Sequence, residues 1–227
     1  MAPRSSDGLI RLGMLALPLA GLLALVGLYS SFQLGTGGIL ATGNNQAIVS
    51  NGYFMSQLLG NALALTLLIF GVMALYAYLA NSGVGALALG AMVLSIFGIA
   101  LTLTGVGVFA YAIPALSRSF LEGNTESIRI LDYMFAGPFE TIGTLTLLLY
   151  SVGFILFGVA IWLSGVLPKW AGVLVAVHAP LISGPFGMVI SVVGALLALV
   201  GGGWIALSVL RSPPAAQMDA EPEPRVR

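Results

Sequence analysis

Two ionisable side chains, Glu140 and His178, fall inside long apolar runs of the 227-residue sequence. An ionisable group within a membrane span is costly to bury, so each is a candidate proton-coupling or ligand-binding group. Each also has a structural explanation. Glu140 follows Gly137 and Pro138, so it fits the first turn of a helix, where a carboxylate meets unpaired N–H groups and the positive end of the helix dipole. His178 can instead be a buried residue that is hydrogen-bonded to a neighbouring carbonyl or hydroxyl group.

The sequence lacks the residues that usually bind metals or perform covalent catalysis. The chain has one histidine and no cysteine, and a single carboxylate inside the apolar runs completes no ordinary zinc site. No Walker sequence, nucleophile-elbow serine or histidine-rich metalloprotease signature is present. We therefore expect no metal, no cofactor and no enzymatic activity.

Neutral polar residues gather at similar depths of the apolar runs. Gln57 and Asn61 are four residues apart, which places them on one face of a helix. With threonines of two further runs, they predict an outward-facing pocket that has Glu140 at its mouth and His178 at its floor. The alternative is that each of these residues hydrogen-bonds across a helix contact. The predicted ligand-binding residues are Glu140, His178, Asn61, Gln57, Thr104 and Thr144.

The composition defines the environment in which these residues must be positioned. The chain is 59% hydrophobic and only 7% charged, whereas soluble domains carry about 25% charged residues. Eight basic and eight acidic residues cancel, so no basic field attracts nucleic acid. The lipid bilayer is the expected partner.

Long apolar runs predict helices, because backbone polar groups in lipid must be paired within the span. We expect an all-α integral membrane protein, a six-helix transmembrane bundle over residues 1–211, followed by a disordered cytoplasmic tail, 212–227. The first run is expected to be a retained helix rather than a cleaved signal peptide. The fifth, at ~1.5 Å per residue, is too short for a ~30 Å hydrocarbon core. The runs are Ile10–Ser31, Tyr53–Ala80, Val84–Ile113, Pro138–Leu163, Pro168–Ile182 and Pro185–Leu210.

The basic residues predict the orientation of the spans. With the N-terminus in the cytoplasm, six basic residues face the cytoplasm and only Arg118 and Arg129 face outside, as the positive-inside rule requires. We therefore expect a multi-pass protein of the cell inner (plasma) membrane with both termini cytoplasmic. The six cytoplasmic residues are Arg4, Arg11, Lys169, Arg211, Arg225 and Arg227.

The outer loop 115–137 contains an amphipathic pattern. Its segment "NTESIRILDYMF" places Ile128, Leu131 and Phe135 on one side, which predicts a short amphipathic helix lying on the membrane surface, capped by Asn124 or Thr125.

Small residues recur every four positions in the first and sixth runs. This spacing predicts close helix contacts, within the chain or with a membrane-protein partner or second copy. The residues are Ala16, Ala20, Ala24, Gly194, Ala198, Gly202 and Ala206.

The segment "WLSGVLPKWAGVLVAV", residues 162–177, contains a helix end, a basic turn of Pro168, Lys169 and Trp170, and a new helix start. It resembles a family of uncharacterised bacterial multi-pass inner-membrane proteins. The resemblance implies a bacterial inner-membrane setting and no particular chemistry.

The expected function is a non-catalytic membrane protein. It binds a small or lipid-like ligand in an outward-facing pocket, or it packs as an accessory subunit of a membrane complex. One alternative is a small proton-coupled transporter that uses Glu140 and His178. A second is a membrane enzyme that acts on a lipid.

Overall fold

The computed structural model describes residues 4–34, 45–183 and 187–211, and within these ranges the chain is helical and has no strand. The predicted tail, 212–227, and the predicted helix start at Pro185 lie outside the described residues. The helical elements are α1 (Arg4–Met14), α2 (Ala16–Leu34), α3 (Asn45–Ile48), α4 (Asn51–Met55), η1 (Ser56–Leu63), α5 (Ala64–Leu79), α6 (Gly85–Gly107), η2 (Val108–Ala112), α7 (Ile113–Leu121), α8 (Glu126–Phe135), α9 (Pro138–Ser164), α10 (Lys169–Ser183) and α11 (Met188–Arg211).

Five helical stretches of the described chain are long and apolar enough to cross a membrane, which makes this a multi-pass membrane architecture. They are Gly8–Leu28, Asn51–Leu79, Gly85–Leu121, Phe139–Ser164 and Met188–Arg211. A shorter apolar helix, α10, has 15 residues. Its length of ~22 Å is short of a ~30 Å hydrocarbon core, as the sequence predicts.

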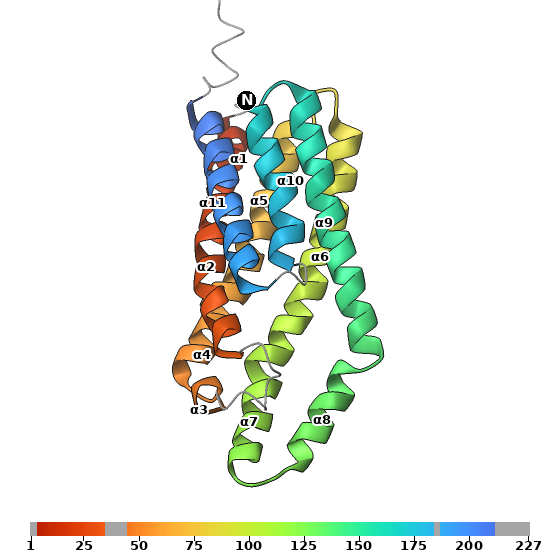
Figure 1. Ribbon diagram of the computed structural model, residues 1–227. Coiled ribbons are helices and arrows are strands. Elements are labelled where there is room, and N and C mark those ends of the chain that lie inside the picture. The colour runs from red at the N-terminus through yellow and green to blue at the C-terminus, as the bar shows by residue number, and fades with distance from the viewer. Residues whose placement is uncertain (1–3, 35–44, 184–186, 212–227) are drawn as a thin grey trace, which may run out of the picture.

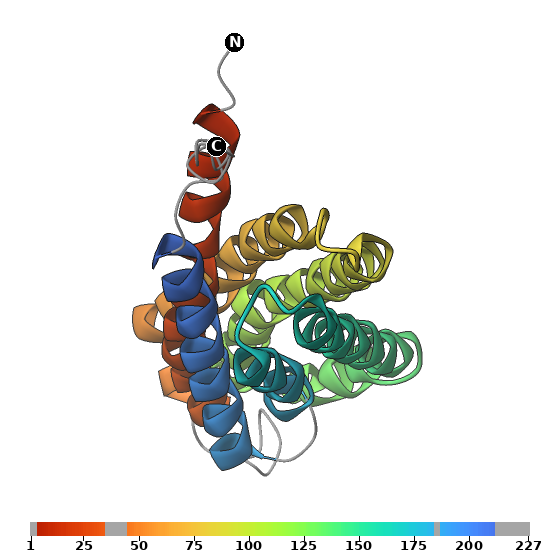
Figure 2. The ribbon, with the colours of Figure 1, turned by 90° about the horizontal axis from the view of Figure 1, so that it is seen from above.

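The long helices form a closed ring (Figures 1 and 2). Along the chain, α2 packs on η1 and α5, α5 on α6, α6 on α9, α9 on α10 and α10 on α11; α11 then returns to contact α2. This ring is built on a continuous apolar core that includes Leu75, Phe154 and Ile205. All six segments therefore present one face to the centre of the bundle.

The first apolar run is interrupted at Leu15, between α1 and α2, where the sequence predicts one continuous helix. Pro18 explains the break. Proline has no N–H to donate to the carbonyl of Met14, and its ring crowds that carbonyl. At this point the Leu15 N–H bonds instead to the Leu12 carbonyl, three residues back, at 3.1 Å.

Two π-helical segments, η1 and η2, lie in adjacent helices, and the periodicity of the sequence does not predict either. η2 ends two residues before Pro114, whose missing N–H and bulky ring disturb the hydrogen bonds of the preceding turn. The N–H of Ile113 consequently reaches back five residues to the carbonyl of Val108. η1 carries Gln57 and Asn61, so the widened turn sets the position of two predicted site residues.

The predicted amphipathic helix exists as α8, but its placement differs from the prediction. α7 and α8 form a hairpin that projects from one end of the bundle, and α8 runs back beside α7 rather than across that end (Figure 1). Leu131 is buried in a small apolar cluster with Ile48, Tyr53 and Ile113. The side-chain oxygen of Asn124 accepts a hydrogen bond from the Glu126 N–H at 3.1 Å, which makes Asn124 the capping side chain.

The basic residues divide between the two ends of the bundle (Figure 1). Arg11, Lys169 and Arg211 belong to the end formed by α1, the α9–α10 connection and the last turn of α11. Arg118 and Arg129 belong to the α7–α8 hairpin at the opposite end. The described basic residues are thus separated into the two groups that the sequence predicts, one at each end of the bundle.

The basic turn "LPKW" connects α9 to α10. α9 ends at Ser164, and the next residue, Gly165, has φ 67°, a left-handed conformation that glycine adopts without strain. Trp162 and Trp170 pack edge to face with ring centroids 6.0 Å apart, and the Lys169 ammonium lies 5.6 Å from the Trp162 ring. These three residues form a cation–aromatic cluster at the turn.

α2 and α11 pack closely within the chain, but through Gly21 and Leu17 of α2 rather than through the predicted Ala20 and Ala24, which line the cavity described below. A Cβ atom on Gly21 would overlap the backbone of Leu199, and one on Gly202 would press on Leu17. Gly194 instead faces the backbone of α10, near Ile182. Part of the spacing by four in α11 therefore serves α2 and part serves α10.

Candidate functional site

A cavity of about 210 Å³ lies at the centre of the ring, between the six helical segments. Its walls are mainly apolar, and small side chains leave the space open. Ala20 and Ala24 of α2, Ala64 of α5 and Ala198 of α11 all line it. Larger side chains at these positions would fill the volume. The cavity therefore depends on small residues at inward-facing positions.

The cavity is elongated along the bundle. On α2 its lining extends from Leu17 to Leu28, eleven residues or ~16 Å by helical rise. On η1 and α5 it extends from Gly60 to Leu75. Two helices thus define one long, narrow space.

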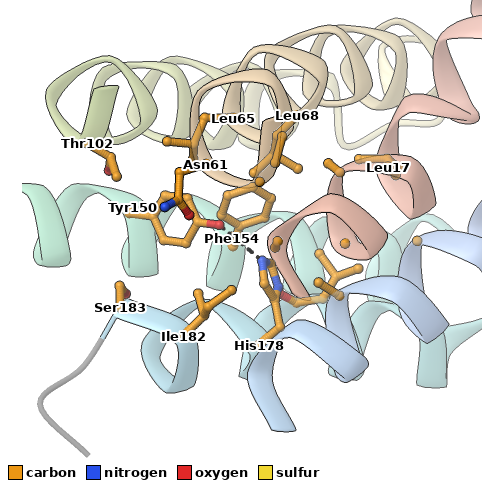
Figure 3. Close-up of a pocket in the computed structure, with 18 of the residues that line it drawn as sticks. Leu17, Asn61, Leu65, Leu68, Thr102, Tyr150, Phe154, His178, Ile182 and Ser183 are labelled. Carbon is orange, nitrogen blue, oxygen red and sulfur yellow. Dashed lines mark hydrogen bonds between the residues drawn. The ribbon is translucent and has the colours of Figure 1, made fainter. Parts of the chain in front are cut away.

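His178 lines this space from the middle of α10 and is almost completely buried (Figure 3). Its Nδ1 is hydrogen-bonded to the Val175 carbonyl. Because a carbonyl only accepts, the proton lies on Nδ1, and the neutral ring has a lone pair on Nε2. The Tyr150 hydroxyl lies 3.4 Å from Nε2 and donates to it.

Tyr150 is a cavity residue that the sequence reasoning missed. It lies on α9, and its hydroxyl points toward His178 across the cavity wall (Figure 3). Gly98 of α6 allows α9 to approach at this level, since a Cβ there would overlap the backbone of Tyr150. Phe154, one turn further along α9, holds the His178 ring edge to face at 4.7 Å. A tyrosine in the middle of an apolar run was the available signal, because a buried hydroxyl needs a partner.

Asn61 enters the cavity from η1 at the end of a hydrogen-bond chain. Its amide donates to Gln57 Oε1 at 2.7 Å, and Gln57 Nε2 donates to the Tyr53 hydroxyl at 3.2 Å. The Tyr53 hydroxyl then donates to the Phe109 carbonyl in η2 at 3.1 Å. Gln57 lies behind Asn61 rather than in the cavity wall, and this chain connects the two π-helical segments.

Two hydroxyl groups complete the polar part of the wall. Thr102 donates to the Gly98 carbonyl at 2.8 Å, and Ser183, at the end of α10, donates to the Ala179 carbonyl at 2.6 Å. Each hydroxyl hydrogen is therefore used within its own helix. The oxygen atoms keep lone pairs that can accept a hydrogen bond.

The other three predicted ligand-binding residues do not line this cavity. Thr104 is exposed and donates to the Leu101 carbonyl at 2.6 Å, and Thr144 is exposed on α9. Glu140 is also exposed, in the first turn of α9, which begins at Pro138 after Gly137. It precedes Tyr150 by ten residues, or ~15 Å along the helix. The structure thus brings His178 and Asn61 to one cavity and leaves Glu140 at a helix start.

Comparisons with protein-family models, with curated proteins and with solved structures find no match for this chain. The likeness of residues 162–177 to uncharacterised bacterial membrane proteins gains no support from them and stays an expectation. The functional argument therefore rests on the cavity and its lining residues.

Proposed function

We propose that this protein is a non-catalytic multi-pass membrane protein that binds a small or lipid-like ligand in the central cavity. The main support for ligand binding is an elongated cavity of about 210 Å³ inside the closed helical ring. The Tyr150–His178 pair and Asn61 line this cavity. Ligand sites in proteins are concave and mainly apolar, with a few polar groups that orient the ligand. An apolar cavity of ~150 Å³ already accepts benzene, so this one has room for a somewhat larger molecule.

The proposal includes a setting in the bacterial inner membrane with six membrane segments and both termini in the cytoplasm. Support comes from Arg11, Lys169 and Arg211 at one end of the bundle, because cytoplasmic ends carry the excess of basic residues. The short helix α10 then enters from the cytoplasmic side and ends inside the membrane. Its last residue, Ser183, lines the cavity, so the cavity reaches toward the outer half of the bundle.

The accessory-subunit role has less support than ligand binding. Two residues of the predicted small-residue faces, Gly194 and Gly202, contact α10 and α2 of the same chain, so these positions are not open to a partner. The proton-coupled alternative also gains no support from the geometry. Glu140 is exposed at the start of α9 while His178 is buried at the cavity, so the two do not form a pair. The lipid-enzyme alternative would depend on Tyr150 and His178 without a carboxylate among the described lining residues.

Native mass spectrometry of the gently extracted protein tests the proposal. We expect an additional bound mass on the wild type that is lost in Ala64→Leu, because leucine at this lining position fills the cavity. Ala62→Leu is the matched control, since Ala62 lies on the same helical stretch but does not line the cavity. A wild type without any bound mass, after extraction and after incubation with membrane lipid extract, would contradict ligand binding.

A further inference from the structure

The polar groups of the cavity are concentrated along one part of its length. Asn61, Thr102 and Ser183 lie toward the α7–α8 end of the bundle, and Tyr150 and His178 lie near the middle (Figure 3). Toward the opposite end the lining consists of apolar residues and glycine, including Leu17, Leu75, Val175 and Gly202. A ligand that matches this wall has a polar head and an apolar chain.

The hydrogen-bond directions further restrict the head group. The hydroxyls of Tyr150, Thr102 and Ser183 each donate to a protein acceptor, namely His178 Nε2, the Gly98 carbonyl and the Ala179 carbonyl. What these oxygens offer to the cavity is therefore acceptor lone pairs. At these three hydroxyls, a ligand that can only accept would have to break an existing bond, whereas a ligand that donates adds a bond to the set.

The charge of the lining restricts the ligand as well. No lysine, arginine, aspartate or glutamate is found among the described residues that line the cavity. A charged head group would be buried there without a counter-ion, which is costly in a low-dielectric interior. The ligand must therefore be neutral.

We infer that the cavity selects a neutral, chain-bearing alcohol whose hydroxyl donates to the Tyr150 oxygen and whose chain lies between Leu17 and Leu75. This inference rests on the proposed ligand-binding function and specifies the chemical class of the ligand. A chain of about ten carbons, ~12–14 Å when extended, fits the elongated lining of ~16 Å.

A matched series of probes tests the inference on the full-length protein in lipid nanodiscs, with empty nanodiscs to subtract partition into the bilayer. 1-Decanol, methyl nonyl ether and undecane have equal numbers of heavy atoms, but only the alcohol donates. We expect the alcohol to bind about three- to tenfold more tightly than the other two, which is the range of one buried neutral hydrogen bond. Decanoate, added at a pH where it is ionised, should bind more weakly than the ether.

Variants separate this inference from the underlying function. In Tyr150→Phe the affinity for 1-decanol should fall to that for the ether. The control Tyr111→Phe, at a tyrosine that is 65% exposed, should leave the affinities for both probes unchanged. Equal binding of the three neutral probes, all abolished by Ala64→Leu, would overturn the alcohol inference and leave ligand binding intact. Tighter binding of the ether or of decanoate would overturn it too. If no probe shows binding that is lost in Ala64→Leu, both proposals are overturned. The ranking of the probes is measured on the wild type, so this part of the test does not depend on the folding of any variant.

Discussion

The Tyr150 hydroxyl and His178 Nε2 lie 3.4 Å apart and join α9 to α10 at the wall of the cavity. The Val175 carbonyl holds the proton on the opposite ring nitrogen, so Nε2 has only a lone pair to offer. The pair therefore has one stable arrangement, in which tyrosine donates and histidine accepts. The same bond fixes the histidine and leaves the tyrosine oxygen able to receive a ligand donor.

The Tyr150–His178 bond should be measurable as a coupling free energy. In a double-mutant cycle of Tyr150→Phe and His178→Ala we expect a coupling between about 0.6 and 1.7 kcal/mol, the average and the maximum found for hydrogen bonds between membrane helices. His178→Ala alone should cost more, about 2–4 kcal/mol, because it enlarges the cavity and leaves the Tyr150 hydroxyl unpaired. Reversible unfolding in mixed micelles measures each free energy of unfolding. A coupling of zero would show that the two side chains do not interact.

The crossing of α2 and η1 depends on two glycines. A Cβ on Gly60 would overlap the backbone of Gly27, so Gly60→Ala should destabilise the protein by about 1–3 kcal/mol through overpacking. Gly90→Ala is the matched control, since nothing lies within 4 Å of a Cβ at that helical position. There we expect no loss, and a gain of up to about 1 kcal/mol from the helix propensity of alanine. Equal stabilities for the two variants in the same unfolding assay would contradict this crossing.

Glu140 should behave as a helix-start residue. Its carboxylate is exposed in the first turn of α9, so Glu140→Gln should cost about 0.3–1 kcal/mol of stability through weakened interaction with the helix dipole. The affinity for 1-decanol should stay unchanged in the same variant. A loss of ligand binding comparable to that of Tyr150→Phe would instead place Glu140 in the functional site.

The membrane orientation is open to direct labelling, because the chain has no cysteine and every introduced thiol is unique. Asn124→Cys places a thiol at the α7–α8 hairpin, and Ser164→Cys places one at the α9–α10 connection. In intact cells a membrane-impermeant maleimide should label position 124 and spare position 164, and inside-out vesicles should reverse the result. Labelling of both positions from one side would contradict the six-segment topology with cytoplasmic termini.

The sequence predicts the five long apolar helices and the shorter α10 because length and hydrophobicity are properties of continuous runs. The 15-residue length of α10, the start of α9 at Pro138 and the separation of the described basic residues all follow from such local signals. The break at Leu15 was also open to prediction, since Pro18 is visible in the sequence, but an apolar run alone does not reveal it.

The membership of the cavity could not be predicted to the same degree. Asn61 and His178 line the same cavity because α2 packs on α11 and closes the ring. This contact is a long-range property of the fold. The sequence places Glu140 at a pocket mouth from its position along the chain, but the depth of a residue does not give the direction of its side chain. Tyr150 is not predicted, because a single tyrosine within an apolar run does not reveal where its hydroxyl finds a partner.

The most direct test of the cavity as a binding site is ¹⁹F NMR of the protein labelled with 3-fluorotyrosine, which reports on its seven tyrosines. The Tyr150 resonance is identified as the one that is absent in Tyr150→Phe. We expect this resonance to shift when 1-decanol is added to the wild type, and to stay fixed in Ala64→Leu. A Tyr150 resonance that stays fixed at saturating 1-decanol, while those of the exposed Tyr111 or Tyr133 move, would contradict the account, because the ligand would then bind outside the ring.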